Sequence, residues 1–105
     1  MEYMKKMYMK EFINNLKNGD GWRNPLAPKT FGNILDKYIS DEDKAHEIVV
    51  HYTDGNTGDG QYFRYHHVWN VYGFFLSDTL YKDLYYASNR HITRDTYGFS
   101  ICHVY

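Results

Sequence analysis

Apolar positions in the N-terminal third of the chain recur at steps of three and four residues. Tyr8, Phe12, Ile13 and Leu16 fall on one stripe, which is the spacing of an amphipathic helix. This pattern predicts a first helix over residues 4–17. Gly19 follows it, and glycine readily takes the left-handed conformation that ends many helices.

Two later segments have the same helical period. A helix beginning near Pro28 would bury one face, made of Phe31, Ile34, Leu35, Tyr38 and Ile39. Ser40 is placed to cap a short turn at residues 41–43, because its hydroxyl can accept from the amide three residues on. Asp78 is the expected cap of a third helix, in which apolar residues at 80, 81, 84 and 85 share a face.

From about Glu47 the period changes to two, which is typical of half-buried strands. The odd positions 63–71 form a second apolar face, and the glycine-rich residues 54–60 between these runs predict an antiparallel hairpin with a seven-residue tip. A last strand is expected over residues 92–105. Because it ends the chain, it is a candidate sheet edge at which a second copy could pair to form a homodimer.

Together these elements predict an α+β fold. We expect two to three helices packed on a small, mainly antiparallel sheet of three or four strands, in a single domain spanning residues 1–105. The apolar fraction of 43% is enough for a hydrophobic core, so disorder is not expected.

Charge and cysteine usage narrow the range of partners. The net charge of −1 gives no overall attraction to nucleic acid or anionic lipid, and no apolar run approaches the ~18 residues of a membrane span. The single cysteine, Cys102, excludes an internal disulfide, and the first residues lack the pattern of a secretory leader. We therefore expect a cytoplasmic protein (in the host cell cytoplasm if it is phage-encoded), with no membrane association and no direct nucleic-acid contact.

Carboxylates gather in the middle of the sequence, and tyrosines gather after them. The hypothesis is that a negative patch docks onto a basic protein partner beside aromatic contact residues, because Tyr and Arg are favoured in interfaces. The predicted partner-binding residues are Asp36, Asp41, Glu42, Asp43, Glu47, Asp54, Asp59, Tyr62 and Arg64.

Histidines offer an alternative, a metal-dependent hydrolase or nuclease. His66 and His67 are neighbours on a strand and point to opposite faces, so a site would need His51 or His103 from a paired strand, with a carboxylate or Cys102. A nuclease arrangement of His67, Asn70 and His91 is a looser version of the same idea. No CxxC, HxxxH or HExxH motif occurs, so we assign no catalytic residue, no metal and no cofactor.

A nucleic-acid-binding regulator is a second alternative, since the order of elements permits a helix-turn-helix with a hairpin wing. Its recognition element would be residues 40–45, which are acidic and wrong for a major groove. The preferred hypothesis is a small non-enzymatic protein-binding module that inhibits a larger nucleic-acid-handling or defence protein. Small lone domains of this composition occur among phage and mobile-element proteins that block host nucleases or defence systems. This comparison rests on size and composition and on no residue motif.

Overall fold

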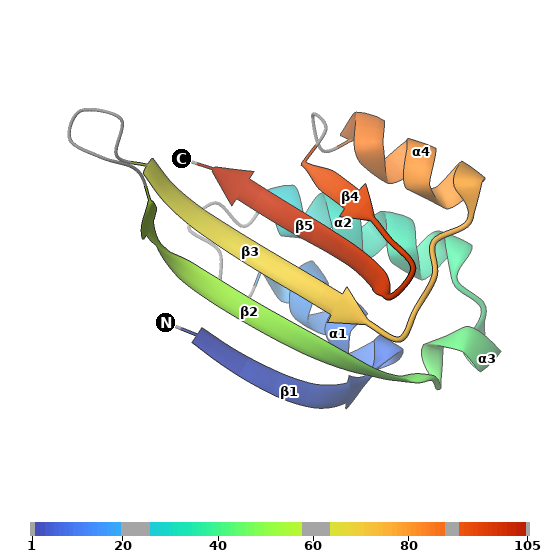
Figure 1. Cartoon of the computed structure of the whole chain (residues 1–105). Coiled ribbons are helices and arrows are strands. Elements are labelled where there is room, and N and C mark those ends of the chain that lie inside the picture. The colour runs from blue at the N-terminus through green and yellow to red at the C-terminus, as the bar shows by residue number, and fades with distance from the viewer. Residues whose placement is uncertain (1, 20–25, 58–63, 88–90, 105) are drawn as a thin grey trace.

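A five-stranded antiparallel sheet forms the centre of the molecule, in the order β1-β2-β3-β5-β4 (Figure 1). The structure is a computed structural model and describes residues 2–19, 26–57, 64–87 and 91–104. Helices α1 (Met9–Asn18) and α2 (Leu26–Tyr38) lie behind the sheet in Figure 1, α4 (Asp78–Ala87) lies beyond its β4 edge, and the short α3 (Asp41–Lys44) lies at one end. The α+β class is confirmed, but the described strands number five, more than the expected three or four.

The N-terminal residues form a strand before they form a helix. β1 (Glu2–Tyr8) pairs along its whole length with β2, and α1 starts only at Met9. The helix predicted over residues 4–17 was therefore wrong over residues 4–8, and Tyr8 is exposed instead of belonging to the buried stripe. The stripe itself is confirmed at Phe12, Ile13 and Leu16, and Gly19 ends the helix in the left-handed conformation.

The central hairpin agrees closely with the alternating pattern. β2 (Glu47–Thr57) and β3 (Arg64–Tyr72) pair antiparallel, with Tyr52 opposite Trp69. The even positions 48–52 and the odd positions 67–71 are buried, as predicted. However, β2 continues through residues 54–57, which the sequence had suggested were part of the turn. Residues 58–63 lie outside the described chain.

The core fills the space between the sheet and the helices. Phe12 of α1 packs edge-on against two rings of the sheet, with centroids 6.0 Å from Trp69 and 6.2 Å from Phe99. α1 and α2 approach closely at Gly32, where an added Cβ would lie 2.7 Å from the Lys17 side chain and 2.8 Å from its backbone nitrogen. Glycine therefore stands inside α2, despite its poor helix propensity, because this crossing leaves no room for a side chain.

The C-terminal segment folds as two strands where one was predicted. β4 (Ile92–Arg94) and β5 (Gly98–Val104) pair as a hairpin. Asp95 shapes the turn, because its Oδ1 accepts from the amides of Tyr97 at 2.7 Å and Gly98 at 3.0 Å. Tyr97 is exposed in this turn and not buried on a strand.

This hairpin places β5 inside the sheet, between β3 and β4. The expectation that the C-terminal strand forms a sheet edge was therefore wrong. Formation of a homodimer stays a prediction. The edges of the described sheet are β1 and β4.

The expected cap of α3 is confirmed, but that of α4 is one residue off. Ser40 Oγ accepts from the Asp43 amide at 3.2 Å. At α4, Ser77 Oγ accepts from the Leu80 amide at 3.2 Å, so Ser77 is the capping residue in place of Asp78.

Candidate partner-binding surface

Five of the nine predicted partner-binding residues lie around α3. Asp36 is in the last turns of α2, residues 41–43 form the first turn of α3, and Glu47 begins β2. Asp54 is seven residues beyond Glu47 on β2, which separates the two residues by about 23 Å at ~3.3 Å per residue. Arg64 begins β3 opposite Thr57, in the same half of the hairpin. The side chains of Asp54 and Arg64, and the whole of Asp59 and Tyr62, lie outside the described part of the structure.

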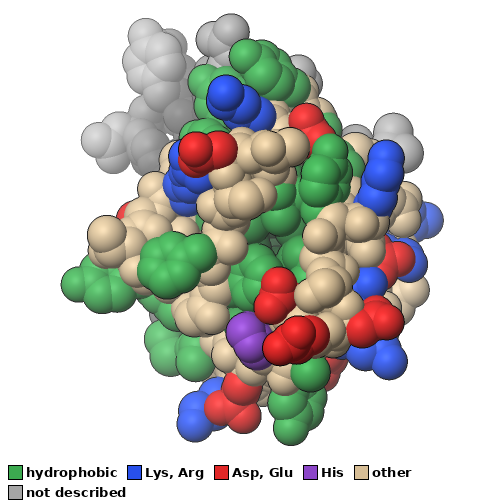
Figure 2. Space-filling model, turned by 90° about the vertical axis from the view of Figure 1, so that its right-hand side faces the viewer, with side chains coloured by type: hydrophobic (Ala, Val, Ile, Leu, Met, Phe, Trp, Pro, Cys, Tyr) green, Lys and Arg blue, Asp and Glu red, His purple; other side chains and the backbone are tan. Residues whose placement is uncertain are grey.

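Two of these five carboxylates, Asp36 and Glu47, have a lysine ammonium within 3.6 Å. Asp36 lies between Lys44, with Nζ to Oδ1 at 2.8 Å, and Lys17, with Nζ to Oδ2 at 3.1 Å. Hydrogen bonds from Lys44 and then Lys17 lower the pKa of Asp36 below its usual value. Glu47 Oε1 is 3.6 Å from Nζ of Lys6 on β1. Acidic and basic side chains are accordingly interspersed over this end of the molecule (Figure 2).

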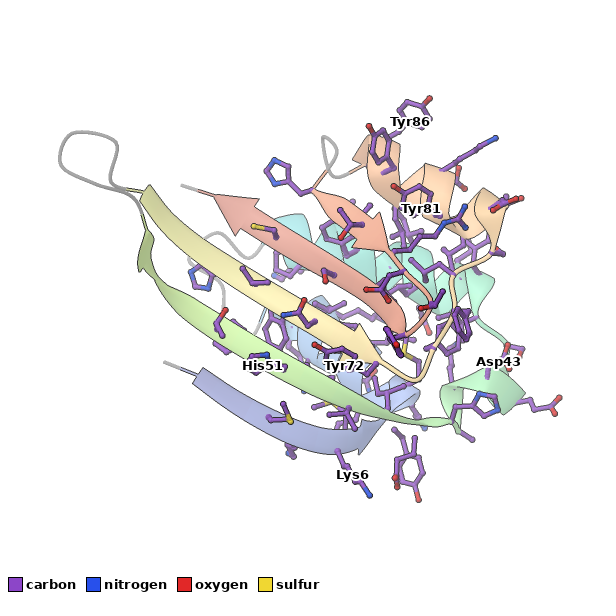
Figure 3. All side chains as sticks on the ribbon, in the orientation of Figure 1. Lys6, Asp43, His51, Tyr72, Tyr81 and Tyr86 are labelled. Carbon is purple, nitrogen blue, oxygen red and sulfur yellow. The ribbon has the colours of Figure 1, made fainter. Side chains whose placement is uncertain are left out.

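Three carboxylates on the first turn of α3 remain as the centre of negative charge: Asp41, Glu42 and Asp43, here called the α3 carboxylates. Asp41 is fully exposed, with only a long 3.9 Å contact to Lys44, and Glu42 is also exposed. Neither Glu42 nor Asp43 forms an ion pair with a described side chain. Asp43 lies on the turn that projects at this end in Figure 3. The Ser40 cap holds that turn in place.

A cleft of about 760 Å³ opens between α1 and α3, here called the α3 cleft. Its lining residues are Tyr8, Lys10, Ile13, Asn14, Asp36, Asp41, Lys44 and Ala45. The lining positions of α1 are spaced i, i+3 and i+4, as are those at α3 and its C-cap, so each helix turns one face toward the cleft. The hydrogen bond from the Met9 amide to the His46 carbonyl, 2.8 Å long, joins the start of α1 to the chain after α3.

Aromatic side chains are exposed over several elements. Tyr8 is 59% exposed at the rim of the α3 cleft. Tyr72, Phe75 and Tyr97 are exposed near the end of the sheet where the Gly73 amide donates to the Tyr97 carbonyl at 2.9 Å. Tyr86 is exposed on α4 (Figure 3). Tyr62, the aromatic residue named in the predicted partner-binding set, lies outside the described residues.

Two of the histidines named as metal ligands, His51 and His67, lie on different faces of the sheet, and the side chains of His66 and His103 lie outside the described part of the structure. His67 is 3% exposed on the core face, where its Nδ1 is 2.8 Å from the Tyr52 hydroxyl. His51 lies on the open face (Figure 3), opposite Asn70 of β3, whose side chain accepts from the Ser100 hydroxyl at 2.5 Å. Among the described residues, no group of three or more His, Cys, Asp or Glu side chains is close enough to hold a metal ion.

Cys102 is half-buried on the same open face, opposite Val68. Burial raises the pKa of its thiol, which lowers the fraction of reactive thiolate at neutral pH. The environment of Cys102 is therefore unlike that of an activated nucleophile.

Sequence reasoning missed the α1 side of the cleft. Ile13 was predicted only as a core residue and Lys10 and Asn14 were given no role, because a helix face beside a buried stripe gives no sign of what lies opposite. The i, i+3, i+4 spacing was visible in the sequence. Its meaning depended on α3, 27 or more residues later, packing beside it.

Comparison of the chain with protein-family models, curated proteins and solved structures gave no match. No helix within the described ranges combines the length and apolar character needed to cross a bilayer.

Proposed function

We propose that this chain is a small non-enzymatic protein-binding module that inhibits a larger nucleic-acid-handling or defence protein, of the kind blocked by phage and mobile-element proteins. It acts in the cytoplasm, and in that of the host if it is phage-encoded. The observation that carries the proposal is the trio of α3 carboxylates, which project from a capped turn beside a cleft and an exposed tyrosine.

Carboxylates presented in this way can occupy the places that phosphates take in a basic groove. They attract Lys and Arg side chains over several ångströms and so increase the rate of productive encounter. Direct nucleic-acid binding through this surface is disfavoured, because the same charges repel the phosphate backbone. Exposed Tyr8 adds rigid contact area next to the charges, which suits a protein partner.

The test uses a charge-neutral variant that preserves shape. Asp41→Asn, Glu42→Gln and Asp43→Asn together remove the three charges and keep oxygen acceptors at the same positions. The wild type is immobilised and exposed to a lysate of the host, and proteins that it retains but a blank matrix does not are identified by mass spectrometry. The association rate of the identified partner is then measured with both wild type and variant.

A matched control removes three charges elsewhere: Asp78→Asn, Asp83→Asn and Asp95→Asn on α4 and the β4–β5 turn. We expect the α3 variant to associate about 10-fold more slowly at low salt, with the difference shrinking as salt rises, because steering by surface charge is screened. The control should associate at close to the wild-type rate. Equal association rates for wild type and the α3 variant would refute docking through the α3 carboxylates.

A further inference from the structure

The two walls of the α3 cleft carry opposite charges. Lys10 stands on the α1 wall and forms no ion pair with a described side chain. Asp41 stands on the α3 wall and is fully exposed. Each of these two groups is available to a bound molecule. Lys10 favours an acidic group and Asp41 favours a basic one.

The other charged residues of the cleft largely satisfy each other. The Lys44 ammonium is 2.8 Å from the Asp36 carboxylate and donates to the Asp36 carbonyl at 3.1 Å. Its side chain is only 17% exposed, so it is held as part of the wall. This pairing leaves the cleft with one accessible positive group and one accessible negative group.

Between the charged walls the lining is apolar or weakly polar. Ile13 lies at the base but is only 1% exposed, so the apolar surface that a bound molecule can reach comes from Ala45 and the ring of Tyr8. A volume of about 760 Å³ lies within the range of clefts that bury drug-sized ligands, so it accommodates a bulky side chain and its neighbours. An apolar side chain seated here would be removed from water on several sides.

We propose that the α3 cleft binds a short segment of the partner protein in which an apolar side chain lies between an acidic and a basic one. The acidic side chain faces Lys10, the apolar one packs against Tyr8 and Ala45, and the basic one faces Asp41. This inference rests on the proposed function, since it names the chemistry of the docking partner. A segment with two basic or two acidic flanks would meet one wall of like charge.

The experiment uses three blocked peptides that differ only in the charged flanks, with the cores Glu-Trp-Arg, Arg-Trp-Arg and Glu-Trp-Glu between Gly-Ser ends. Binding to the full chain is followed by NMR shifts of the backbone amides of Asn14 and Ala45, which line opposite walls. We expect the mixed-charge peptide to bind about fivefold more tightly than either other peptide, the size expected for exchanging a repulsive exposed pair for an attractive one.

Two substitutions make the result specific to the cleft. Lys10→Glu makes both walls acidic and should shift the preference to Arg-Trp-Arg, whereas Lys82→Glu on the exposed surface of α4 makes the same charge change and should leave the preference unchanged. Ala45→Trp fills the cleft and should abolish binding of all three peptides. Ala87→Trp, at the end of α4, is its matched control.

Three outcomes would overturn the proposal: no shifts at Asn14 and Ala45 with any peptide up to millimolar concentration, equal affinities for the three peptides, or an unchanged preference in Lys10→Glu. If these occur while neutralising the α3 carboxylates still slows partner association, only the cleft assignment fails. If the peptides behave as expected but partner association is insensitive to the α3 carboxylates, the docking surface in the proposed function fails instead.

Discussion

Replacing Gly98 by alanine should remove a large part of the stability of the fold. Gly98 begins β5 with φ +156°, opposite Tyr72 of β3. A Cβ at this position would lie 1.9 Å from the carbonyl oxygen of Val71 and 2.9 Å from its carbonyl carbon. Contacts below 3.0 Å are essentially never made by real Cβ atoms, so the strand would have to move away by more than an ångström.

That movement would break hydrogen bonds that hold the end of β5. The Gly98 amide donates to Asp95 Oδ1 at 3.0 Å, and the Gly98 carbonyl accepts from the Asp95 amide at 3.0 Å. Losing two hydrogen bonds at about 1 kcal/mol each, with backbone strain of about 1–3 kcal/mol, gives a destabilisation of about 3–5 kcal/mol. Even 3 kcal/mol should lower the Tm by roughly 12–24 °C in a domain of this size.

Thermal unfolding followed by circular dichroism measures the effect against two other glycines. Gly73→Ala places a Cβ in a positive-φ position (+95°) but no closer than 3.5 Å to other atoms, so it should lose about 1–2 kcal/mol. Gly55→Ala meets nothing within 4 Å and should be close to neutral. The reasoning is refuted if Gly98→Ala unfolds within a few degrees of Gly55→Ala.

Three further changes test other parts of the structure. Tyr52→Phe removes the hydroxyl 2.8 Å from Nδ1 of buried His67 and should lower the free energy of unfolding by about 1–3 kcal/mol in urea titrations; an unchanged midpoint would contradict this. The pKa of Asp36 is lowered chiefly by Lys44, so the contribution of this carboxylate to stability is present above its unfolded pKa, near 3.8, and is lost as pH falls through the lower folded value. Asp36→Asn should therefore flatten the fall in the free energy of unfolding below about pH 4. A variant whose stability falls with pH in parallel with that of the wild type would count against the pairing. Burial raises the pKa of the Cys102 thiol, so its alkylation by iodoacetamide at pH 7.5 should be slower than that of free cysteine in the folded protein and should accelerate on unfolding.

Local physical signals in the sequence determined several elements. The alternation around Tyr52 and Trp69 predicted the β2–β3 hairpin, because a strand with one buried face must alternate apolar and polar side chains. The Ser40 cap was also predictable, since the hydroxyl and the amide it caps are three residues apart. The buried stripe of α1 followed from helical geometry alone.

Other features depended on contacts between distant parts of the chain. The pattern of residues 4–8 is compatible with a helix or a strand, and pairing with β2, 39 to 47 residues later, selected the strand. The turn at Asp95 divided the last predicted strand in two and moved β5 from the edge to the interior. Propensity is weak at such positions, so the tertiary partner decides.

The candidate site shows the same division. The sequence by itself determined that carboxylates gather in residues 36–59, and it fixed the three on α3 as neighbours. Only the tertiary structure brought Lys6 and Lys17 beside two of those carboxylates and placed Lys10 across a cleft from Asp41. Electrostatic interaction depends on distance in space, and distance along the chain does not determine it.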